Sequence, residues 1–370
     1  MDALPPGPAA LAPDIVAPLP EWNPDTDDVL VCRQVRQETH DVATFVFSAR
    51  NPCLFRFKPG QFLTLELPIG GAVINRCYTI SASSARPYRL SITVKRQPGG
   101  VVSNWLHDNL RPGAEIRAIG PLGDFTPPPS SRAKWLLLSG GSGITPLMSM
   151  ARTCCDLGED RDIVFVHAAR SPRDIIFRHE LDLMAQQMLR LRLAHICESA
   201  VGEKAWSSFV GRLSLPMLQL IAADVLEREV FCCGPAPFMA AICAMLQAAG
   251  FDMARYHQES FDFAELSRTE DVVDPTPEPE PGTSTFRLEF TKSGRVIECR
   301  SDTTVLSAAR DAGLRLPSSC TRGLCGTCKS RIVSGTVDMK HEGGIRQREI
   351  DQGLALLCCS KPTSDLVIDR

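Results

Sequence analysis

Four cysteines near the carboxyl end of the chain have a spacing that suits very few structures. They are Cys320, Cys325, Cys328 and Cys358, in the pattern C-x4-C-x2-C, a long gap, then C. Four thiolates at these intervals match the ligand set of a two-iron, two-sulfide (2Fe-2S) cluster. The loop that holds the first three also contains two glycines, which let the backbone close around a compact anion. The spacing therefore predicts a centre that accepts one electron at a time.

Composition excludes several other classes of protein. A length of 370 residues predicts two or three domains, and a charged fraction of 22% with a net charge of −3 argues against a nucleic-acid-binding protein. No apolar run approaches the roughly eighteen residues that span a membrane, and the proline-broken N-terminus lacks the basic start of a signal peptide. Fifteen cysteines without such a signal indicate a reducing compartment, so we expect a cytoplasmic protein.

Changes in residue pattern divide the chain into five segments. Residues 1–28 are expected to form a flexible tail. Six short β-like runs within residues 29–130 predict a six-stranded antiparallel β-barrel. Residues 131–263 alternate strand-like and helix-like runs, which predicts a doubly wound parallel α/β domain. Proline and acid at 264–283 predict an extended linker, and residues 284–370 begin again with a hairpin and a helix before the cluster loop.

Candidate ligands for a flavin nucleotide lie where one predicted barrel strand ends and where a helix begins. They are Arg76, Cys77, Tyr78 and Thr79 at the strand end, and Gly100, Val101, Val102 and Ser103 at the helix start. An arginine can pair with phosphate, a tyrosine can stack on the ring, and a threonine can bond the ring edge, while helix N-terminal amides favour anions. The alternative interpretation is a barrel strand followed by an ordinary capped helix.

A glycine-rich turn follows the first strand of the predicted α/β domain, where such folds bind a pyrophosphate. It includes Gly141, Gly143, Thr145 and Pro146. A second strand end, with Cys233, Gly234 and Pro235, precedes another helix at the same edge of the sheet. Glycine and proline keep this edge open for a flat ring, and Cys233 could touch a nicotinamide there. The alternative for any one cysteine is a small buried apolar residue.

The order of these motifs carries a resemblance to a known family. RCYT, GGVVS, GPLGDF, GGSGITP and CCGPAPFM resemble the ferredoxin–NADP reductase superfamily, and the cluster loop with LLCCSKPTSD resembles a plant-type ferredoxin of α+β β-grasp fold. Flavin, nicotinamide and then ferredoxin is the order of the reductase components of Rieske-type oxygenases that demethylate glycine betaine, stachydrine or carnitine. The reductase of the hybrid cluster protein resembles this layout equally.

The resemblance implies roles for individual residues. Glu259 and Phe261, in HQESF, match the acid and the aromatic residue that close over the flavin in related reductases, and we expect them beside the reacting ring with Cys233. In the ferredoxin segment a proline four positions after the fourth ligand is typical. Pro362 therefore selects Cys358, not its neighbour Cys359, as that ligand.

The choice of nucleotide depends on the segment that follows the second strand of the α/β domain. Arg170 and Arg173 would suit an adenosine 2′-phosphate, whereas Asp174 would suit a bare ribose diol and repel the phosphate. The resemblance favours NADH over NADPH, and the motif GGVVS with the family likeness favours FAD over FMN.

Basic residues crowd the cluster loop, and the last segment carries fourteen Lys and Arg against ten Asp and Glu. Arg315, Arg322, Lys329 and Arg331 stand close to the ligands. One interpretation is a set of solvated surface charges. The other is a face that steers the domain toward an acidic docking surface on a partner protein.

Three functions remain open on the sequence alone. The first is an NADH-dependent reductase that passes electrons through FAD and the 2Fe-2S cluster to a Rieske-type non-haem iron oxygenase component, which acts on a quaternary ammonium compound. The second is a reductase for a hybrid-cluster protein or another acceptor. The third is an electron-carrier module with a degenerate flavoprotein half, which the complete set of glycines and Arg76 argues against. In each, the linker would let the ferredoxin domain move between its donor and its acceptor.

Overall fold

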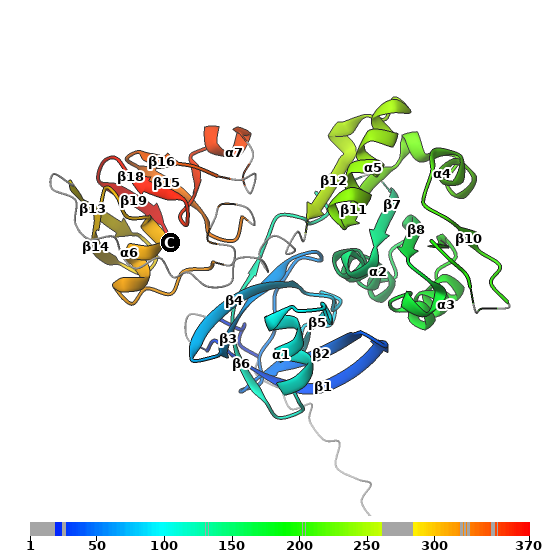
Figure 1. Ribbon diagram of the computed structural model, residues 1–370, viewed down its shortest axis with the longest axis horizontal. Helices are drawn as coiled ribbons and strands as arrows, with labels where there is room; N and C mark the ends of the chain where they lie inside the picture. The colour runs from blue at the N-terminus through cyan, green and yellow to red at the C-terminus, as the bar shows by residue number, and fades with distance from the viewer. Residues whose placement is uncertain are drawn as a thin grey trace, which may run out of the picture.

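The computed structural model describes residues 19–23, 27–129, 131, 133–201, 203, 205–260, 284–318, 321, 323, 326–341, 345 and 347–370. Five sequence predictions lie outside these ranges: most of the tail, the linker at 264–283, Phe261, the two ligands Cys320 and Cys325, and the basic residue Arg322. Figure 1 shows three folded domains, with the first between the other two. No described helix is long and apolar enough to cross a bilayer.

The first domain is a six-stranded antiparallel sheet, as the sequence predicts. Its strands are β1 (Val29–Thr39), β2 (Val42–Ala49), β3 (Phe62–Ile69), β4 (Ala72–Thr79), β5 (Leu90–Lys95) and β6 (Glu115–Leu122), and helix α1 (Val101–Asn109) follows β5. They pair in the order β4-β3-β6-β1-β2-β5, and a bridge between Ile80 and Ile92 joins the two outer strands and closes the barrel. Alternate residues of β3, such as Leu63 and Leu65, fill the core.

One strand of the barrel begins earlier than the sequence interpretation placed it. The run CYTISAS suggests a strand that starts at Cys77, but β4 starts at Ala72 and pairs with β3 along its whole length. Gly70 and Gly71, with φ of 61° and 83°, form the two-residue hairpin turn between them. The flavin motif therefore lies at the end of a strand, as expected, and this strand is longer at its start than the pattern suggested.

The second domain is a parallel sheet covered by helices, which confirms the doubly wound prediction. Its strands are β7 (Lys134–Gly140), β8 (Asp162–Ala169), β9 (Leu191–Cys197), β10 (Phe209–Val210), β11 (Glu229–Gly234) and β12 (Tyr256–Ser260), in the order β10-β9-β8-β7-β11-β12. Its helices are α2 (Ile144–Leu157), α3 (Arg178–Gln187), α4 (Leu215–Ile221) and α5 (Ala236–Ala248). The order reverses beside β7, so the glycine-rich turn after β7 lies at the crevice that such folds use for ligands.

Helix α3 is shorter than the sequence pattern suggested. The run IIFRHELDLMAQQM suggests a helix from Ile175, but Phe177 has a φ of 59° and the helix begins only at Arg178. Ile175, Ile176 and Phe177 are all buried, because this segment fills the core beneath the loop after β8. The strand β10 and the helix α4 have no counterpart in the sequence interpretation.

The third domain is a mixed sheet with one helix across it. Its elements are β13 (Thr285–Phe290), β14 (Arg295–Arg300), α6 (Val305–Asp311), β15 (Lys329–Ser334), β16 (Val337–Met339), α7 (Gln347–Asp351), β17 (Leu354–Leu356), β18 (Ser360–Pro362) and β19 (Leu366–Asp369). The main sheet has the order β14-β13-β19-β15-β17, with β13 parallel to β19 at its centre. This arrangement agrees with the expected α+β β-grasp fold.

Candidate functional site

The end of β4 provides the first part of the site. Tyr78 packs against the barrel core, and its burial raises the pKa of the phenol above the ordinary value. The hydroxyl of Thr79 is buried and has no hydrogen-bond partner among the residues that the structure describes. A buried hydroxyl of this kind is rare unless a bound group completes it. Tyr78 and Thr79 therefore fit the aromatic face and polar edge of a flavin ring.

The loop before α1 is built around Ser103. Its hydroxyl accepts from the N–H of Gln97 at 3.1 Å and lies 3.4 Å from the carbonyl of Gly100. A Cβ on Gly100 would come within 2.7 Å of this hydroxyl, so a larger residue there would displace the Ser103 side chain. Ser103 thus shapes the loop. Helix α1 begins at Val101 and Val102, and the backbone amides of this first turn are the groups suited to bind a phosphate.

The turn after β7 packs backbone against backbone. Residues Gly141–Gly143 form a short 3-10 turn that leads into α2. A Cβ on Gly143 would lie 2.4 Å from the carbonyl oxygen of Cys233, so no side chain fits there. Gly141 has a φ of 52° and open space above it. This combination leaves a bare backbone surface that a pyrophosphate can approach.

Two residues that follow the turn are buried and have a structural role. Thr145 is buried, and its hydroxyl lies 3.3 Å from the carbonyl oxygen of Ser142. Pro146 is buried in the first turn of α2. Both therefore set the shape of the turn from beneath.

Cys233 and Gly234 end β11 at the same edge of the sheet. Cys233 is fully buried, and burial raises the pKa of its thiol well above the ordinary value, so it stays protonated. Gly234 lies against Gly140, where a Cβ would come within 3.0 Å of the Gly140 nitrogen. Pro235 precedes α5 and contacts the same spot. The chemistry open to Cys233 is contact with a ring and not nucleophilic attack.

A row of polar side chains crosses the sheet at this edge, which the sequence interpretation missed. Glu259, Cys233, Ser139, His167 and His195 occupy neighbouring register positions on five adjacent strands. The Ser139 hydroxyl lies 2.8 Å from Nδ1 of His167. Burial, with His195 nearby, lowers the pKa of His167 to about 3 and keeps it neutral. Both histidines are interior residues.

Within this row, Glu259 is the residue whose pKa is moved close to neutral pH. Burial, reinforced by the carboxylate of Asp124 from the barrel, raises its pKa to about 8. Its Oε2 atom is buried and has no hydrogen-bond partner within the described residues. Glu259 is therefore a neutral acid at pH 7, and its carboxyl group fits beside a bound ring as a proton donor or a hydrogen-bond donor.

Replacing Glu259 by glutamine is expected to stabilise the protein at alkaline pH. A carboxyl whose pKa is raised on folding stabilises the folded state below its ordinary pKa, and this contribution is lost as pH rises to about 8. The difference in unfolding free energy between Glu259→Gln and wild type should therefore grow by up to about 1.4 kcal/mol per pH unit between about pH 5 and pH 8. Thermal melts across this range measure it. Glu298→Gln, on the exposed face of β14, is the matched control, and identical curves for both variants would contradict the assignment.

Helix α2 attaches the second domain to the barrel directly after the flavin motif. Arg152 donates to the carbonyl of Ser81, and Ser149 donates to the carbonyl of Ala82 at 2.7 Å. The Ser84 N–H donates to Thr153 at 3.0 Å. Because α2 starts at the glycine turn and these partners follow Thr79, the contacts fix the two predicted nucleotide sites relative to each other.

The described part of the cluster loop agrees with Cys328 and Cys358 as ligands. Both are buried, the Gly323 N–H donates to Cys358 Sγ at 3.2 Å, and the Cys358 N–H donates to Cys328 Sγ at 3.4 Å. Amide donors of this kind stabilise thiolate charge. Cys359 Sγ instead lies 3.5 Å from the carbonyl oxygen of Leu356. This geometry favours Cys358 over Cys359, and these residues fit a 2Fe-2S cluster.

The third domain contacts the barrel through the flavin motif itself. Cys77 Sγ lies 3.0 Å from the hydroxyl of Thr327, and Asn75 donates to the hydroxyl of Ser318 at 3.4 Å. Thr327 directly precedes the ligand Cys328. Only Cys77 and Thr327 therefore lie between Tyr78 and the cluster ligand Cys328, which makes a short route for an electron.

The expected nucleotide-selecting residues lie at the junction with the barrel. Asp174 accepts from the Ser171 hydroxyl at 2.5 Å and lies 3.9 Å from His40, so its carboxylate is already engaged. Arg170 is exposed, 3.9 Å from Asp41 of the barrel, and Arg173 is exposed. The two arginines are thus the more accessible of the three groups.

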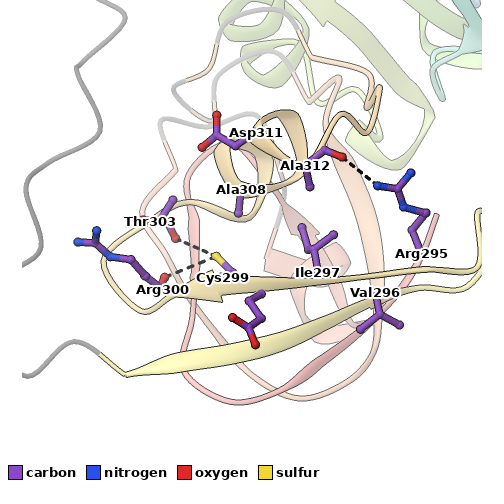
Figure 2. A pocket seen from close by; sticks show the side chains of 10 residues that line it. Arg295, Val296, Ile297, Cys299, Arg300, Thr303, Ala308, Asp311 and Ala312 are labelled. Carbon is purple, nitrogen blue, oxygen red and sulfur yellow. Dashed lines mark hydrogen bonds between the residues drawn. The ribbon is translucent and has the colours of Figure 1, made fainter.

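A shallow cavity of about 510 Å³ lies in the third domain between β14 and α6 (Figure 2). Arg295 donates to the carbonyl of Ala312 across one end, and Cys299 is in its floor. Burial raises the pKa of Cys299 to about 12. None of the sequence-predicted site residues lines this cavity, so it is separate from the sites described above.

Comparison with known sequence families covers all three domains. Residues 30–126 match an oxidoreductase FAD-binding domain, residues 137–244 match an oxidoreductase NAD-binding domain, and residues 289–363 match a 2Fe-2S iron-sulfur cluster binding domain. The order of the three matches is the order of the three folded domains.

Individual relatives match nearly the whole chain. The glycine betaine monooxygenase reductase subunit of Pseudomonas aeruginosa is 49% identical over 343 residues, which cover 91% of this chain and 94% of the relative. The stachydrine N-demethylase reductase subunit of Rhizobium meliloti is 44% identical over 333 residues, covering 90% and 94%. The solved structure of phthalate dioxygenase reductase is 26% identical with a TM-score of 0.56, covering 94% of this chain and all of that one. The chain therefore belongs to the family of ferredoxin–NADP reductase-like oxygenase reductases that combine FAD-binding, NAD-binding and 2Fe-2S domains.

Proposed function

We propose that this reductase supplies electrons to a Rieske-type non-haem iron oxygenase component that demethylates a quaternary ammonium compound such as glycine betaine or stachydrine. As a member of its family, the chain is an oxidoreductase with FAD, NAD and 2Fe-2S domains that serves a terminal oxygenase. The Rieske type of that partner and its substrate are the proposed part. They are supported by the two relatives above, whose names specify glycine betaine and stachydrine.

The contact between Cys77 and Thr327 is the observation that supports the internal route most directly. When bound, a flavin takes the electron pair of a nicotinamide hydride and releases it as single electrons to the cluster. In this chain Tyr78 and Thr79 would hold the ring, and the bare turn at Gly141–Gly143 would hold the pyrophosphate. Glu259 would retain a proton in the space between them, and α2 keeps the two nucleotide sites in register.

The proposed residue roles follow the same geometry. Arg76 and the α1 amides would bind the flavin phosphates, and Cys233 with Gly234 would border the nicotinamide. Cys320 and Cys325, which lie outside the described residues, would complete the ligand set with Cys328 and Cys358. FAD as the flavin agrees with the family match of the first domain. A cytoplasmic location, expected from the fifteen cysteines, belongs to the same proposal.

We propose NADH as the preferred nucleotide, on the family likeness. The exposed Arg170 and Arg173 are the groups that would admit NADPH, so they give a direct test. Replacing both by alanine should leave kcat/KM for NADH within about threefold while further lowering any NADPH activity. An enzyme that prefers NADPH before the change, and loses that preference afterwards, would reverse the assignment.

Reconstitution tests the partner and the substrate together. The purified holoenzyme is mixed with NADH and the oxygenase component of the P. aeruginosa glycine betaine system, and formaldehyde released from glycine betaine or stachydrine is measured. We expect release that depends on both proteins. Reduction of cytochrome c at normal rates without any reduction of the oxygenase would exclude this partner, and favour a hybrid-cluster protein or another acceptor.

A further inference from the structure

The barrel makes two junctions of different character. With the second domain it shares a hydrophobic core, in which Val42 and Phe125 of the barrel pack in one cluster with Trp135 and Leu137. The core of the third domain, around Leu288 and the rest of its sheet, includes no barrel residue within the described parts of the chain. A junction without a shared apolar core is the kind that opens and closes readily.

Charge holds the third domain on the barrel. Arg315, which precedes the cluster loop, forms ion pairs with Asp28, the residue before β1 that the structure places against the barrel, and with Glu66 of β3. The two carboxylates are only 16% and 12% exposed, whereas Arg315 is 42% exposed. Partly buried carboxylates are screened less than surface ones, so this double pair is stronger than an ordinary surface ion pair.

Lys329, which follows the cluster loop at the start of β15, makes a second charged contact with the barrel. Its ammonium lies 3.6 Å from Asp124 of the barrel and 2.6 Å from Glu349 of its own domain. Together with Ser318 and Thr327, which contact β4, these two residues form what we call the docking face: Arg315, Ser318, Thr327 and Lys329. Two of the basic residues that the sequence placed beside the cluster therefore face acids of the same chain.

The docking face includes a residue that is next to a cluster ligand in the chain. Thr327 is directly bonded to Cys328, which is itself 3% exposed. An external acceptor that takes an electron through this short route has to occupy the position that the barrel occupies in the structure. The acids of the barrel, at the rim of that position, show which charge the face recognises.

We propose that the docking face is used twice, first on the acidic rim of the barrel and then on an acidic surface beside the metal centre of the acceptor protein. This rests on the proposed function only in that the acceptor is a separate protein. The two complexes exclude each other, so Asp28 and Glu66 compete with the acceptor for Arg315. In the second complex a reduced cluster held by these cysteines would supply one electron to one metal ion of the acceptor, with no bond made or broken.

Two variants, on opposite sides of the two Arg315 ion pairs, separate this proposal from a purely internal role. Asp28→Asn with Glu66→Gln removes the barrel's hold and leaves the docking face intact. Arg315→Gln removes the same contact from the docking face. Both should loosen the third domain, seen as a larger radius of gyration by small-angle X-ray scattering at low ionic strength, where wild type stays compact.

Their effects on an external acceptor should have opposite signs. With the prereduced holoenzyme and the acidic copper protein plastocyanin as the probe, the double variant should transfer electrons about threefold to tenfold faster than wild type, and Arg315→Gln about threefold to tenfold slower. Basic cytochrome c is the control acceptor, and Arg315→Gln should not slow its reduction.

Equal acceleration by both variants would show that Arg315 serves the barrel alone and would overturn the proposal. An unchanged radius of gyration in both would overturn it as well, because the ion pairs would then not hold the domain. These measurements use no oxygenase. They therefore stand or fall separately from the reconstitution that tests the proposed function.

Discussion

Replacing Cys358 by alanine is expected to remove the 2Fe-2S cluster and leave the flavoprotein half working. Cys358 is buried, accepts the Gly323 N–H, and offers its own N–H to Cys328, so its sulfur lies inside the loop that surrounds the cluster. Loss of one of four thiolates should abolish cluster binding. Reduction of ferricyanide by NADH, which the flavin can perform alone, should change by less than about twofold, while reduction of cytochrome c should fall by roughly a hundredfold or more.

The adjacent residue provides the matched control. Cys359→Ala removes a thiol of the same size one position away, whose sulfur lies near the carbonyl of Leu356. We expect this variant to retain the cluster, measured as iron and acid-labile sulfide content and as the visible absorption of the oxidised protein. Retention of a full cluster in Cys358→Ala, with loss of the cluster in Cys359→Ala, would show that Cys359 and not Cys358 is the fourth ligand.

The motifs could be predicted from the sequence because each depends on residues close together in the chain. The cluster spacing, the RCYT strand end and the glycine turn are local patterns whose geometry follows from residue type. The alternation of strands and helices predicted the doubly wound domain for the same reason. The hairpin at Gly70 and Gly71 was equally local, and recognising that glycine pair would have placed the start of β4 correctly.

Features that depend on the register of distant segments were not predictable in this way. The row from Glu259 to His195 exists because five strands, far apart in the sequence, align at one level of the sheet. The raised pKa of Glu259 needs the burial that this alignment creates, together with Asp124 from another domain. No pattern within one segment contains that information.

The basic residues of the cluster loop are a second example of features that the sequence predicts only in part. Their charge was evident from composition, but their partners were not. Arg315 binds Asp28 and Glu66, which are more than 240 positions away in the chain. The sequence interpretation offered solvent or an external partner for such residues, and the structure adds a third answer, the barrel of the same molecule.

Replacing Gly143 by alanine is expected to disable the nucleotide site with little effect on flavin content. Gly143 has a φ of −65° and a ψ of 0°, which any residue adopts, so backbone strain does not explain the glycine. The added Cβ would instead lie 2.4 Å from the carbonyl oxygen and 2.5 Å from the carbonyl carbon of Cys233. Both partners are backbone in the centre of the sheet, so the turn itself has to move.

A shift of the turn by about 1 Å should lower the rate of flavin reduction by NADH roughly a hundredfold, because hydride transfer depends on the position of the bound nucleotide. Stopped-flow measurement of flavin bleaching gives this rate. Gly158→Ala is the control at the other end of α2: its φ is 64° and no atom lies within 4 Å of the new Cβ. It should cost about 1 kcal/mol of stability and leave the rate unchanged. Comparable rates in both variants would mean that the turn yields without disturbing the nucleotide, and that its close packing against Cys233 does not position the pyrophosphate.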